Sequence, residues 1–81
     1  MLTIKVLGPG CANCRKLEEI ARAAATSAGI AAEVVKVTDM QQIVGYGVLK
    51  TPGLVIDEKL VCSGRIPAPE SVAEWIKTAA A

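Results

Sequence analysis

Two cysteines separated by two residues, Cys11 and Cys14, stand between a short apolar run and a long helical pattern. The run at positions 2–7 alternates between two faces, which predicts a β-strand. Gly8-Pro9-Gly10 ends that strand, and the cysteines follow where a helix begins. Backbone N–H groups and the helix dipole favour an anionic sulfur at such a position. The pair can therefore close a small disulfide ring or bind a soft metal, and the rest of the chain is needed to distinguish the two.

The remaining sequence predicts further strands and helices. Leucine, isoleucine and alanine recur at helical spacing over residues 12–28, and Gly29 is placed to end that helix in a left-handed conformation. Valines on both faces of residues 30–37 predict a strand parallel to the first, inside a covered sheet. The later elements are expected as a short helix at 40–44, a hairpin of strands at 54–56 and 59–63, and a final helix at 69–79. This order predicts one α/β domain over residues 1–81, with a four-stranded mixed sheet and three helices (β-α-β-α-β-β-α).

Composition removes several classes of function. Histidine is absent, which excludes Cys–His and Ser–His catalytic pairs and most zinc enzymes. Nine basic against eight acidic residues, with one tyrosine and one tryptophan as the only aromatic residues, do not support a nucleic-acid surface. No apolar run approaches the roughly 20 residues needed to span a bilayer, and no secretory signal pattern opens the chain. We therefore expect a cytoplasmic protein without nucleic-acid or membrane partners.

Three cysteines, an odd number, fit a reducing compartment better than a disulfide scaffold. The third, Cys62, is expected in the fourth strand on the same face as Leu60, where a cysteine is most often a small core residue. Lys5, Arg15 and Lys16 lie near the cysteine pair in sequence. All three are expected to be solvated, with Arg15 placed to assist the thiolate.

The order of elements, with the cysteine pair at the first strand–helix junction, resembles thioredoxin. Thr51-Pro52 stands just before the third strand, where thioredoxin-like proteins keep a cis-proline beside the dithiol, and Gly64 closes the fourth strand as the family's glycine does. The short length and the opening GPGCANC are most similar to the small redox-active disulfide proteins of bacteria and archaea. Thioredoxin differs in having tryptophan before the first cysteine and Gly-Pro between the pair, so its redox poise does not transfer.

The resemblance implies a thiol–disulfide oxidoreductase that needs no cofactor beyond a redox-active Cys11–Cys14 disulfide. Cys11, at the helix start, is expected to attack a protein or small-molecule disulfide, and Cys14 to resolve the mixed disulfide. The Thr51–Pro52 bond is expected to be cis, leaving the Thr51 backbone to align the substrate. The implied partners are a disulfide-containing protein and an unidentified reductase, and a monomer is expected. The implied supporting loop and substrate-binding residues are Gly10, Ala12, Asn13, Thr51 and Pro52.

A Cu(I) or Zn(II) carrier that uses the same two cysteines is the alternative. Heavy-metal-associated domains also place CxxC between a first strand and a first helix, but they run βαββαβ and end in a strand. Their motif has methionine two residues before the first cysteine, where this sequence has Pro9. Two thiolates would also leave a zinc site incomplete. The sequence therefore favours redox chemistry, with no metal at the site.

Overall fold

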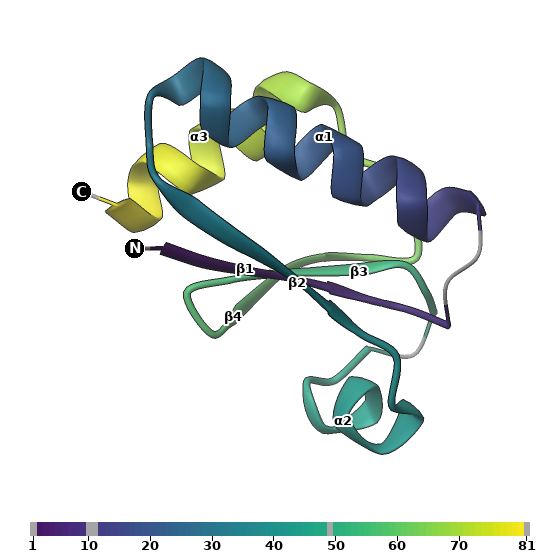
Figure 1. Ribbon diagram of the computed structural model, residues 1–81. Helices are drawn as coiled ribbons and strands as arrows, with labels where there is room; N and C mark the ends of the chain where they lie inside the picture. Colours follow the sequence, from purple (N-terminus) through teal and green to yellow (C-terminus); the bar gives the residue numbers. More distant parts are fainter. Residues whose placement is uncertain (1, 10–11, 49, 81) are drawn as a thin grey trace.

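Four strands and three helices follow one another in the predicted order in a computed structural model, which describes residues 2–9, 12–48 and 50–80 (Figure 1). Their bounds are β1 (Leu2–Leu7), α1 (Ala12–Ala28), β2 (Ala32–Val37), α2 (Met40–Gly45), β3 (Gly53–Ile56), β4 (Lys59–Ser63) and α3 (Pro69–Ala80). The strands form one sheet in the order β2-β1-β3-β4. β1 pairs parallel with β2 and antiparallel with β3, and β3 pairs antiparallel with β4. The predicted fold class, a mixed sheet with three helices, is confirmed.

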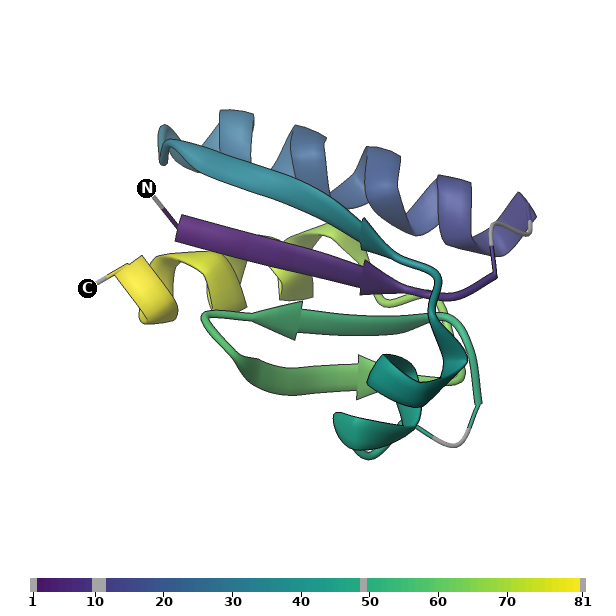
Figure 2. The same ribbon diagram turned by 60° about the horizontal axis from the view of Figure 1, so that its bottom comes forward.

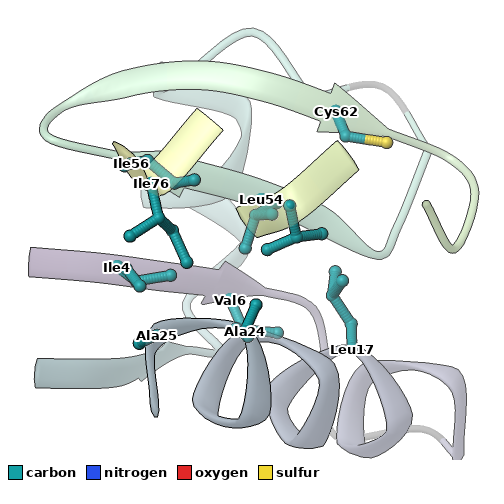
Figure 3. Packing of buried hydrophobic residues seen from close by; sticks show 11 residues of the cluster. Ile4, Val6, Leu17, Ala24, Ala25, Leu54, Ile56, Cys62 and Ile76 are labelled. Atoms are coloured by element: carbon teal, nitrogen blue, oxygen red, sulfur yellow. The ribbon is translucent and has the colours of Figure 1, made fainter. Parts of the chain in front are cut away.

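Helices α1 and α3 cover one face of the sheet and α2 lies on the other, at the end where β1 and β2 finish (Figures 1 and 2). The main core lies under α1 and α3, because alternate residues of β1 and β3 point to that face. Alanines on α1 let the helix lie close to the strands, as Figure 3 shows. The buried members from these four elements include Ile4, Val6, Leu17, Ala21, Ala24, Leu54, Ile56, Val72 and Ile76.

A smaller apolar cluster lies between the sheet and α2. Its strand members, Leu7, Val37 and Val55, belong to the residues that alternate away from the main core. The Asp39 carboxylate begins α2 by accepting a hydrogen bond of 2.8 Å from the Gln41 N–H. No helix in the described ranges is both long and apolar enough to cross a membrane.

The second strand differs from its prediction in two ways. It begins at Ala32 rather than residue 30, because the Ile30 N–H bonds to the Ala25 carbonyl at 3.0 Å and completes the end of α1. Gly29 makes this ending possible with φ of 69°, as predicted. β2 is also an edge strand rather than an interior one, since β3 pairs on the opposite side of β1. Val34 and Val35 are therefore only partly buried, one on each face of this strand.

The expectation that Leu60 and Cys62 share a face is wrong. Leu54 pairs with Cys62 while its neighbour Val55 pairs with Leu60, so the ladder shifts register at Val61. This β-bulge reverses the alternation of side chains along β4. Cys62 joins the main core at 7% exposure, and Leu60 turns to the other face at 37%.

Candidate active site

The site is built at the junction between β1 and α1. The Gly8 N–H donates to the Val37 carbonyl at 2.9 Å, which holds the chain after β1 against the end of β2. Cys14 lies in the first turn of α1 and is buried, with 5% of its surface exposed. A methyl group built on Gly8 would overlap the Cys14 Sγ. The backbone at Gly8 is therefore packed directly against the sulfur, and no side chain fits between them.

Thr51 lies beside the same glycine, and Pro52 follows it in the chain. A Cβ atom on Gly8 would lie 3.7 Å from the Thr51 Cβ, so Gly8 is flanked by Thr51 and Cys14. The Thr51–Pro52 peptide bond is cis, as predicted. Pro52 is buried, and its carbonyl accepts a 2.8 Å hydrogen bond from the Gly64 N–H. The fold thus brings together residues that are about 40 positions apart in the sequence.

Not all the predicted site residues can be placed. Ala12 and Asn13 are exposed on the first turn of α1. Gly10 and Cys11 lie outside the described residues, so the pairing of Cys11 with Cys14 stays a prediction. Cys62 lies apart on β4, where its Sγ is 3.8 Å from the Arg65 carbonyl oxygen.

A cavity of about 140 Å³ opens beside Cys14, between β1, α1 and β2. Its lining includes Glu18, which stands one helical turn after Cys14. The Glu18 carboxylate accepts a hydrogen bond from Arg22 at 2.8 Å and lies 3.3 Å from the Lys36 Nζ. The hydrogen bond from Arg22, and then that from Lys36, hold the pKa of Glu18 below its ordinary value despite partial desolvation. Lys36 reaches Glu18 because β2 pairs with β1, so the sequence of α1 alone does not predict this ion pair.

Because the pKa of Glu18 is lowered by folding, its ion pairs stabilise the protein above pH 4.5, the ordinary value, and this contribution is lost as pH falls through the lower folded value. We expect the free energy of unfolding of Glu18→Gln to fall less steeply than that of wild type between about pH 5 and pH 3. Urea unfolding at several pH values measures this. Glu19→Gln is the matched control, because Glu19 is exposed and forms no ion pair with any described residue. A Glu18→Gln variant as acid-sensitive as wild type would contradict the prediction.

Lys5 lies on the α2 side of the sheet and is ion-paired rather than simply solvated. Its Nζ donates to the Tyr46 hydroxyl at 2.6 Å and lies 2.6 Å from the Glu58 Oε1. The hydrogen bond to Glu58 is the main reason that the pKa of Lys5 is raised. The same bond lowers the pKa of Glu58. This trio links β1, the end of α2 and the β3–β4 turn, so its contribution is to the scaffold of the site.

A mixed sheet of this order, with a cysteine in the first turn of α1 and a cis-proline before β3, defines a thioredoxin-like fold. A family model described as "Thioredoxin domain" matches residues 2–77. A thioredoxin from Methanothermobacter thermautotrophicus is 42% identical over 72 residues, covering 89% of this chain and 94% of its own length. A thioredoxin from Methanocaldococcus jannaschii is 38% identical over 78 residues, covering 96% and 90%. The chain belongs to the thioredoxin family, and it is a thioredoxin-like oxidoreductase.

Among solved structures, a Nu-class GST from Haemonchus contortus matches with a TM-score of 0.47 at 20% identity. That match covers 96% of this chain but only 36% of the other.

Proposed function

We propose that the protein reduces disulfides with Cys11 as the attacking thiol and Cys14 as the resolving thiol. The Cys11 thiolate attacks one sulfur of the substrate, forms a mixed disulfide and releases the other sulfur as a thiolate that takes up a proton. Cys14 then gives up its proton and attacks the Cys11 sulfur, which releases the second substrate thiolate. The pair ends as a disulfide, and two electrons have passed to the substrate. A reductase must then supply two electrons to the Cys11–Cys14 disulfide. A reducing compartment such as the cytoplasm and action as a monomer fit this proposal.

The observation that carries the assignment of roles is the burial of Cys14 against Gly8. A cysteine with 5% exposure is poorly placed to meet a disulfide on another molecule but well placed to act inside the protein. The Cβ of Thr51 lies beside the same glycine, and the Thr51 backbone is the proposed guide for the substrate segment, with Pro52 as its support. Gly10, Ala12 and Asn13 complete the proposed loop around the pair.

Trapping a mixed disulfide tests the roles of the two cysteines. We expect Cys14→Ser, made in a Cys62→Ala background, to hold an aromatic thiol adduct on Cys11 after reaction with an activated aromatic disulfide. In the same background, Cys11→Ser should react at least about tenfold more slowly, because Cys14 is buried. Stopped-flow absorbance and mass spectrometry of the adducts provide the measurement.

Equal rates in the two variants would contradict the proposed asymmetry. The alternative, a Cu(I) or Zn(II) carrier, uses both sulfurs as equivalent ligands and needs no asymmetry. A wild-type protein that reduces no disulfide but keeps Cu(I) against a chelator would replace the proposal with that alternative. Cys62→Ala alone is the control, and it should exchange like wild type because Cys62 lies apart from Gly8 and Cys14 on β4.

A further inference from the structure

Four exposed cations stand next to Cys14, Thr51 and Gly64 in the chain. We name them the basic rim: Arg15, Lys16, Lys50 and Arg65. None of the four side chains has an ion pair or hydrogen bond to any residue in the described part of the chain. Their charges are therefore available to a molecule that approaches from solvent.

Contacts connect the rim to the site on both sides. Arg15 lines the cavity beside Cys14 and follows it on α1. Lys50 immediately precedes Thr51, and its stem packs on the chain at Gly64, where an added Cβ would lie 3.0 Å from the Lys50 Cβ. Arg65 follows Gly64, whose N–H is bonded to the Pro52 carbonyl. Arg15 therefore lies beside Cys14, while Lys50 and Arg65 lie beside the segments joined by the hydrogen bond between Pro52 and Gly64.

This concentration of charge is local, since the whole chain has a formal net charge of only +1. Three other cations are paired within the fold, Lys5 with Glu58, and Arg22 and Lys36 with Glu18. Asp39, which begins α2 at the same end of the sheet, has its carboxylate bonded to the Gln41 N–H. Lys59 and Lys77 lie at the opposite end, beside the β3–β4 turn and the end of α3 (Figures 1 and 2).

We propose that the basic rim selects protein disulfides flanked by acidic side chains. The inference rests on the proposed exchange function and adds the class of substrate. Complementary charge around a reacting pair accelerates encounter and disfavours basic partners, and salt weakens both effects. The side chains of the rim supply the attraction, while the backbone at Thr51 supplies alignment.

Two otherwise identical peptides test the proposal, one with its disulfide flanked by glutamates and the other with lysines in their place. At an ionic strength of about 20 mM we expect kcat/KM to favour the acidic peptide by about tenfold. The preference should shrink towards unity at about 0.5 M salt, where the Debye length falls to a few ångströms. Reduction of a neutral small disulfide, measured alongside, reports exchange without charge selection.

Matched variants locate the effect. Lys50→Glu combined with Arg65→Glu should remove the preference, because Arg15 and Lys16 are then balanced by two glutamates. The glutamine pair at the same positions leaves two of the four cations and should reduce the preference without removing it. Lys59→Glu combined with Lys77→Glu changes the net charge equally at the far end and should keep the preference. If wild type reduces the neutral disulfide but treats both peptides alike, or if the far-end pair also removes the preference, the rim proposal fails while the exchange function stands. If wild type does not reduce the neutral disulfide, the proposed function itself fails.

Discussion

Replacement of Gly8 with alanine is expected to slow disulfide exchange by about 10- to 100-fold, because the new methyl group would occupy the space of the Cys14 Sγ. The sulfur must then adopt another rotamer, or α1 must move away from β1. Either change displaces Cys14 from the position that its resolving role requires. Overpacking of this kind also costs about 1–3 kcal/mol of stability. The rate of disulfide reduction, the lifetime of the mixed disulfide and urea unfolding together measure the two effects.

Gly45→Ala is the matched control. Within the described ranges, no atom outside the local helix backbone lies within 4 Å of an added Cβ at Gly45, and its φ is not positive, so the same change should leave exchange unaltered. A Gly8→Ala protein with wild-type exchange and an unchanged lifetime of the mixed disulfide would show that the contact between Gly8 and Cys14 does not control the reaction.

The second large effect is expected on stability. Leu54→Ala should lower the free energy of unfolding by about 2–5 kcal/mol, since Leu54 is fully buried beside Val6 and Cys62 and its loss leaves a cavity. Native proteins have about 5–15 kcal/mol in total, so this variant should lose a large fraction of its stability. Urea unfolding followed by circular dichroism measures the change.

Leu60→Ala makes the same chemical change one element away, on β4. Leu60 is 37% exposed, so its replacement should cost clearly less than that of Leu54. Equal costs at the two positions would mean that the bulge in β4 does not separate the two side chains as described.

Most of the fold could be predicted because the short-range signals agree with one another. Alternating side chains predict β1, and apolar residues at helical spacing predict α1. Gly29 has the left-handed conformation that its position after α1 predicts. The bulge at Val61 could not be predicted, because its cause lies in the pairing of β4 with β3 rather than in the residues of β4. The edge position of β2 likewise depends on where β3 pairs.

Less of the site than of the fold could be predicted from the sequence. Thr51-Pro52 is predicted beside the cysteine pair through a resemblance, and the structure shows Thr51 beside Gly8, which is packed on Cys14. The close packing of Gly8 on the sulfur was not predicted, since a glycine before a cysteine pair has an ordinary role in ending a strand. Long-range ion pairs were missed for the same physical reason: the partner of Lys5 is 53 positions away, at Glu58 (58 − 5).

The β3–β4 turn has a consequence for how this part of the chain folds. Asp57 and Glu58 both adopt left-handed backbone conformations, with φ of 52° and 64°, which glycine and asparagine accept more readily than glutamate. The turn therefore has little local preference to close, and contacts from elsewhere hold it: the Asp57 N–H bonds to the Thr3 carbonyl at 3.0 Å, and Glu58 binds Lys5. Both of those partners belong to β1. The last two strands of the sheet thus depend on the first for their connection, so this hairpin is a product of the assembled sheet rather than a unit that forms by itself.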